Sequence, residues 1–111
     1  MISSSLTLAG LLLVGCGKSE QPPKILEVVS DRSSSAIRQC VASREGKRLF
    51  AGLSSLAGPT RGPAGSYYML VASDGTWIQI YAEMSEPNAI VVRSRRPLSD
   101  AQLRFLRECA A

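Results

Sequence analysis

A chain of 111 residues, 45% of them hydrophobic, has room for one small domain and a tail. Thirteen basic and nine acidic residues give a formal net charge of +4, an ordinary value for a soluble domain. The chain contains no histidine, which excludes His-based catalytic triads and the usual zinc and haem ligands.

The N-terminal segment has the pattern of a secretory signal. Residues 6–14 form an aliphatic run that is too short to span a bilayer but has the length of a signal-peptide core. The run ends in Leu13-Val14-Gly15-Cys16, which resembles the lipobox of bacterial lipoprotein signals. The resemblance implies that the Cys16 thiol receives a diacylglyceryl group and that the chain is cut immediately before it. The alternative is a buried hydrophobic segment with an incidental cysteine.

The next residues are typical of a tether. They are polar and include two consecutive prolines, with no periodicity that could bury one face. We therefore divide the chain into a signal peptide (1–15), a lipidated N-terminus with a flexible tether (16–24), and a small domain (25–111). The lipid on Cys16 would anchor this domain to a membrane of the bacterial cell envelope, facing the periplasm. The inner and the outer membrane both stay open.

The number of cysteines in the chain predicts a disulfide bond. Once Cys16 is assigned to the lipid, Cys40 and Cys109 remain as an even pair in an oxidising compartment. A disulfide between them would close a loop of about 70 residues, and the chain-entropy model values it at roughly 4 kcal/mol. The alternative is two buried free thiols.

The first half of the domain predicts one strand and one helix. Residues 24–30 are rich in β-branched side chains and predict a strand. A serine cap and an apolar stripe with helical spacing predict a helix over 33–44, ended by Gly46. Residues 47–56 are ambiguous, because their leucines have nearly helical spacing but include a glycine. Residues 57–65 predict a loop.

A β-hairpin is the clearest element of the second half. Asp74-Gly75 lies between two β-rich runs, which is the strongest short-range hairpin signal. A two-residue turn pairs Ser73 with Thr76. That register also predicts the pairs Val71–Ile78, Met69–Ile80 and Tyr68–Tyr81. Residues 88–95 then predict a third strand of an antiparallel meander.

Several independent sequence signals in the C-terminal segment predict a helix. Ser99 is the expected N-cap, Gln102 closes a capping box, and Leu98 and Leu103 occupy the positions of a hydrophobic staple. Cys109 flanks the apolar stripe of this helix. Together these elements predict an α+β fold. It consists of a three- or four-stranded antiparallel sheet with two helices, linked by the disulfide, on one face.

Strand alternation sorts the predicted sheet into two faces. One face is aliphatic and should lie under the helices: Met69, Val71, Ile78, Ile80, Ile90 and Val92. The other also carries Leu70 and Val91, and its candidate binding residues are Tyr68, Trp77, Gln79, Tyr81, Arg93 and Arg95. Aromatic rings can stack on sugars or on a partner's side chains, and guanidinium groups can bind carboxylate or phosphate. The alternative is that residues 47–56 fold over this face and bury it.

The sequence contains few residues in patterns that are typical of catalytic sites. The sequence has no paired-carboxylate motif, no Gly-x-Ser-x-Gly elbow, no phosphate-binding loop and no Cys-x-x-Cys. It therefore predicts no catalytic residue, metal or cofactor, and the basic run 93–96 is interpreted as a solvated strand end rather than a nucleic-acid site. We predict a non-catalytic binding or accessory module for an envelope protein or glycan. The alternatives are an anchored structural scaffold and an enzyme with an unrecognised site.

Overall fold

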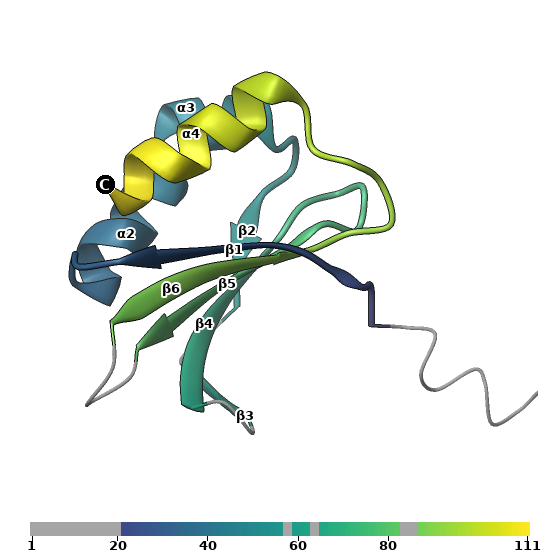
Figure 1. Cartoon of the computed structure of the whole chain (residues 1–111). Helices are drawn as coiled ribbons and strands as arrows, with labels where there is room; N and C mark the ends of the chain where they lie inside the picture. The colour runs from purple at the N-terminus through teal and green to yellow at the C-terminus, as the bar shows by residue number, and fades with distance from the viewer. Residues whose placement is uncertain (1–20, 57–58, 63–64, 83–86) are drawn as a thin grey trace, which may run out of the picture.

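The computed structural model describes residues 21–56, 59–62, 65–82 and 87–111 (Figure 1). This part of the chain is an α+β domain in which helices lie on one face of an antiparallel sheet. The strands are β1 (Lys24–Ser30), β2 (Ser54–Ser55), β3 (Thr60–Gly62), β4 (Gly65–Val71), β5 (Trp77–Ala82) and β6 (Asn88–Arg93). The helices are α2 (Ser34–Val41), α3 (Arg44–Leu49) and α4 (Asp100–Ala110).

The sheet is larger than predicted. It has six strands in the order β1-β6-β5-β4-β2, with β3 also paired to β4, and the described residues include three helices rather than two. The meander β4-β5-β6 agrees with the prediction. The additional strands β2 and β3 pair along one edge of β4, where Ser54 lies opposite Val71 and Thr60 opposite Tyr67. They come from the ambiguous segment 47–56 and the predicted loop 57–65.

The predicted helix over 33–44 is wrong in its extent, because two short helices replace it. Helix α2 ends at Val41, and Ser43 then caps α3 by accepting a hydrogen bond from the Gly46 N–H at 3.4 Å. Gly46 is buried inside α3 rather than at a helix end. A Cβ atom at this position would lie 1.7 Å from the carbonyl oxygen of Val41. Glycine is therefore required here by the close approach of two helices.

The register of the β4–β5 hairpin also differs from the prediction. Its loop has three residues, 73–75, since the N–H of Ala72 donates to the carbonyl of Thr76. Gly75 adopts φ +92°, and the Asp74 carboxylate accepts from the Thr76 N–H at 3.0 Å. A left-handed glycine at the third loop position is typical of a three-residue hairpin. The register shifts by one residue, and every side chain of β4 consequently changes face.

The hydrophobic core lies between the helices and the sheet. Strands β5 and β6 contribute the four side chains predicted for this face, all with no exposed surface: Ile78, Ile80, Ile90 and Val92. Phe50 and Leu53 belong to the same core cluster. The segment 47–56 therefore packs on the helix side of the sheet and at the β4 edge, and does not cover the opposite face.

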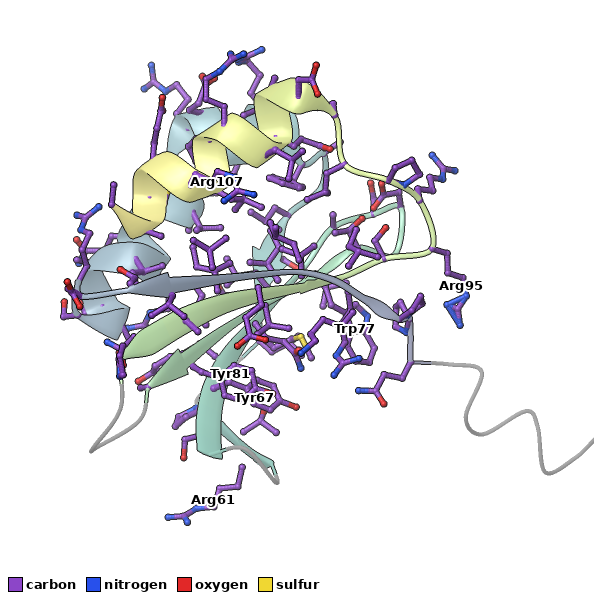
Figure 2. All side chains as sticks on the ribbon, viewed as in Figure 1. Arg61, Tyr67, Trp77, Tyr81, Arg95 and Arg107 are labelled. Atoms are coloured by element: carbon purple, nitrogen blue, oxygen red, sulfur yellow. A yellow bond between two sulfur atoms is a disulfide. The ribbon has the colours of Figure 1, made fainter. Side chains whose placement is uncertain are left out.

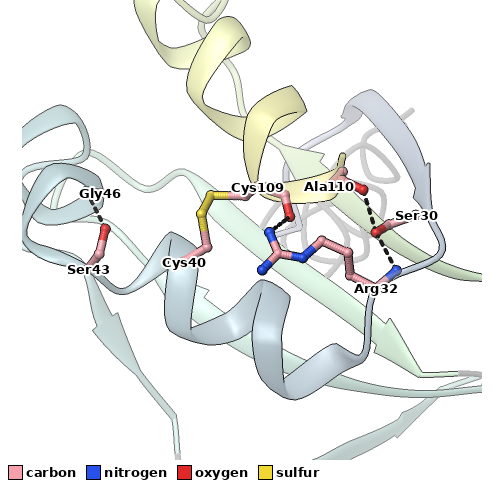
Figure 3. Close-up of a disulfide and its surroundings, with 7 residues drawn as sticks. All are labelled: Ser30, Arg32, Cys40, Ser43, Gly46, Cys109 and Ala110. Carbon is pink, nitrogen blue, oxygen red and sulfur yellow. Dashed lines mark hydrogen bonds between the residues drawn. A yellow bond between two sulfur atoms is a disulfide. The ribbon is translucent and has the colours of Figure 1, made fainter.

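Helix α4 is joined to the rest of the domain at its C-terminal end (Figure 3). The predicted disulfide between Cys40 and Cys109 is present and links α2 to α4, with the Cα atoms 5.6 Å apart. The Ser30 hydroxyl donates to the carbonyl of Ala110 at 2.6 Å, and the Arg32 guanidinium donates to that of Cys109 at 2.9 Å. These bonds satisfy carbonyls that have no partner within the helix. At the other end of α4 the predicted capping box is confirmed.

Candidate functional site: the aromatic face

We call the sheet face opposite the helices the aromatic face. Cross-strand partners share a face, so its side chains form rows across three strands. The rows are Val71–Trp77–Arg93, Met69–Gln79–Val91 and Tyr67–Tyr81–Ala89. Figure 2 shows the labelled rings of Tyr67, Trp77 and Tyr81 on the side of the sheet away from α4.

The shifted register changes which residues of β4 belong to this face. Tyr68 was predicted here but lies on the helix side, where it packs against the core and the guanidinium of Arg38 lies 3.9 Å from its ring centre. Met69 and Val71 were predicted on the helix side and lie on the aromatic face instead. Tyr67, which is not among the predicted binding residues, takes the place of Tyr68. Asp74-Gly75 fits both a two-residue and a three-residue loop, so the local sequence does not distinguish the two registers.

The middle row of the aromatic face is buried. Gln79 is 2% exposed, Met69 7% and Val91 6%, although no described helix lies over them. The Nε of Arg93 donates to the Gln79 side-chain oxygen at 3.1 Å, and its NH1 donates to the Pro22 carbonyl at 3.4 Å. Both of these predicted binding residues are thus engaged within the domain. Their hydrogen bonds hold the two side chains within the domain, so neither extends from the aromatic face toward a partner.

Two tyrosines form the row at one end of the face. The ring centres of Tyr67 and Tyr81 are 4.9 Å apart and the planes are inclined by 43°. Both side chains are half-buried. Burial, with a smaller contribution from the neighbouring Tyr67, raises the pKa of the Tyr81 hydroxyl. The pair offers two aromatic rings with hydroxyl groups, a chemistry that suits sugars and protein side chains alike.

A hollow of about 330 Å³ lies at the other end of the face. Its lining consists of Pro22, Asp74, Gly75, Trp77, Arg95 and Arg96. Arg95 and Arg96 follow the end of β6, which stops at Arg93 and not at residue 95 as predicted, and both side chains are exposed. Hydrogen bonds from the side chain and the backbone N–H of Thr76 lower the pKa of the Asp74 carboxyl, and the positive charge of Arg96 lowers it further.

The predicted site residues therefore separate into two groups. Trp77 and Arg95 line the hollow, whereas Tyr81 pairs with Tyr67 at the opposite end. Cys16, the predicted lipidation site, lies outside the described residues. Within the described ranges, no group of three or more histidine, cysteine or acidic residues could hold a metal ion, and no helix has the length and apolar character needed to cross a bilayer.

Comparisons of the chain with protein-family models, curated proteins and solved structures gave no match. Function is therefore inferred from the geometry of the aromatic face and from the sequence around Cys16.

Proposed function

We propose that this protein is a lipid-anchored component of the bacterial cell envelope that binds an envelope protein or glycan without catalysing a reaction. The anchor is the diacylglyceryl group expected on Cys16, and the binding surface is the aromatic face at the tyrosine pair. The domain faces the periplasm in this proposal, which is the compartment in which a bridge between Cys40 and Cys109 would persist.

The observation that carries the binding role is the Tyr67–Tyr81 pair. Its rings lie on the sheet face opposite the helices, and their neighbour Gln79 is fixed by Arg93. Tyrosine is favoured at binding surfaces because it gives a large contact area and a hydroxyl group at a low cost in side-chain entropy. Rings that are already held in place lose little further freedom when a partner binds.

The anchor is tested by the intact mass of the protein purified from bacterial membranes. We expect a chain that begins at Cys16, carries the mass of its acyl groups, and exposes thiols at Cys40 and Cys109 only after reduction. A chain that retains residues 1–15 and has three free thiols would contradict both the anchor and the compartment.

The binding role is tested with a photo-crosslinking residue placed in living cells at Thr60, an exposed residue that pairs with Tyr67, and with sedimentation of the purified protein with isolated cell-wall sacculi. We expect either a discrete protein adduct or co-sedimentation. The double substitution Tyr67→Ala and Tyr81→Ala should weaken either signal by at least about 10-fold, as for central aromatic contacts.

The matched control changes two exposed residues on the other side of the domain, Arg104→Ala and Arg107→Ala in α4, and should leave binding unchanged. A thermal melt of each variant separates lost binding from lost folding. If the folded tyrosine variant binds as well as the wild type, the binding role fails and an anchored structural scaffold becomes the better interpretation.

A further inference from the structure

The chain between the expected anchor and the domain leaves the sheet at a defined place. Pro22 is buried and its carbonyl accepts from Arg93, while the carbonyl of Pro23 accepts from the Ser94 N–H at 3.0 Å. The predicted tether thus joins the domain before β1 begins at Lys24. The point of attachment lies beside the hollow, since Pro22 is one of its lining residues.

The part of the predicted tether that precedes Pro22 is short. Five residues, 17–21, separate Cys16 from Pro22. A fully extended chain spans at most about 3.6 Å per residue, so Pro22 stays within about 20 Å of a lipidated Cys16. Trp77 and Tyr81 are four residues apart on β5, which places the tyrosine row about 13 Å farther along the sheet. The Trp77 end is accordingly the end that a lipid anchor would hold nearest to the bilayer.

The chemistry of this end suits a phospholipid surface. A second hollow of about 430 Å³ shares Arg95 and Arg96 with the first and is lined on its apolar side by Ile25, Leu98 and Leu103. Ile25 is 40% exposed. Arginine binds phosphate through its planar fork, and tryptophan is enriched at the level of the lipid headgroups. Two exposed guanidinium groups against the single carboxylate of Asp74 leave the two hollows with net positive charge.

We propose that the surface formed by Trp77, Arg95 and Arg96 docks on the anionic phospholipid headgroups of the membrane that holds the anchor. This inference rests on the proposed lipid anchor and adds an orientation to it. The Trp77 end lies on the bilayer, and Tyr67 and Tyr81 are left accessible to a partner in the periplasm. A phospholipid surface is the expected partner for two reasons. The short tether keeps this end of the domain near the bilayer, and the positive charge of the two arginines complements anionic headgroups.

The test uses the one tryptophan of the chain as its own reporter. The lipidated protein is reconstituted into phosphatidylcholine vesicles with or without phosphatidylglycerol, and Trp77 fluorescence is quenched with a lipid that carries a nitroxide on its headgroup. We expect stronger quenching with phosphatidylglycerol, and a loss of this difference at high salt. The change Arg95→Ala with Arg96→Ala should reduce the ratio of docked to free domains on the order of 10-fold.

The control variant, Arg104→Ala with Arg107→Ala, removes the same charge from α4 and should retain the quenching. Flotation of the vesicles separates this inference from the proposed anchor. Two results would overturn the docking alone, provided that the protein floats with the vesicles. The first is equal quenching with and without phosphatidylglycerol, and the second is equal quenching in the wild type and in the variant with Arg95→Ala and Arg96→Ala. Protein that does not float and carries no acyl mass overturns the anchor, and the docking inference with it.

Discussion

The two faces of the sheet are closed in different ways. On the helix side, Ile78, Ile80 and Ile90 are fully buried under backbone elements that a disulfide holds together. On the aromatic side, Gln79 is almost as buried, although no described helix lies over it, and its side-chain oxygen accepts a hydrogen bond from Arg93. The helix side is thus held by the packing of several elements, whereas the described support of Gln79 includes a single side-chain hydrogen bond. Substitutions should therefore cost more stability on the first.

The largest effect should come from removing the link between α2 and α4. The double substitution Cys40→Ala and Cys109→Ala opens a loop with a sequence separation of 69 residues. We expect the free energy of unfolding to fall by about 4 kcal/mol, chiefly because the unfolded chain gains conformational entropy. Chemical denaturation measures the change, and the reduced wild type serves as a control. A loss below about 1 kcal/mol would show that packing alone holds the helix layer.

The next largest effect concerns the junction of α2 and α3. Gly46→Ala would place a Cβ atom against the Val41 carbonyl, a backbone group that cannot move away without shifting a helix. We expect a loss of more than about 2 kcal/mol. The control is Gly75→Ala in the hairpin loop, where no atom lies within 4 Å and only the left-handed φ opposes the change, at about 1 kcal/mol. Equal losses in denaturation would contradict the close-packing explanation.

The elements that could be predicted from the sequence are those for which local rules agree. For α4, the capping box and the apolar stripe indicate the same helix, and the structure has it at residues 100–110. The strict alternation in β5 and β6 places Ile78, Ile80, Ile90 and Val92 on the correct face, because side chains alternate whatever the register. The disulfide follows from the parity of the cysteines after Cys16 is set aside.

The remaining errors arise where two local solutions have similar sequence signals. Asp74-Gly75 fits a two-residue turn and also the last two positions of a three-residue loop, and one residue of difference moves Tyr67 and Tyr68 to opposite faces. Glycine is a common helix terminator, but Gly46 is buried inside α3 by the contact between α2 and α3. The pairing of β2 with β4 is a long-range contact that two serines do not indicate.

A smaller effect is expected from the hydrogen bond that supports the middle row of the aromatic face. Arg93→Leu leaves the buried side-chain oxygen of Gln79 without its donor, and we expect a loss of about 1–2 kcal/mol. The change Gln79→Leu in the same protein should recover part of this loss, because the unsatisfied polar group is removed as well. A double-mutant cycle in denaturant measures the coupling. Additive losses would show that the two side chains do not act together.

The smallest effect concerns the pH dependence of the hairpin loop at the Trp77 end. Hydrogen bonds from Thr76 lower the pKa of the Asp74 carboxyl in the folded domain. The folded state therefore binds fewer protons than the unfolded chain just below the ordinary aspartate pKa of about 3.9. The contribution to stability is complete above this value and is lost as the pH falls through the lower pKa of the folded state.

Asp74→Asn isolates this contribution, because asparagine can still accept from the Thr76 N–H but does not titrate. We expect the difference in unfolding free energy between wild type and variant to be constant above about pH 5 and to shift against the wild type in more acidic solution. The shift should be the smallest of these effects, since the Asp74 side chain is exposed and solvent screens its charge. A difference that stays flat through the acid range would mean that the loop is held by backbone conformation at Gly75 and not by the carboxylate.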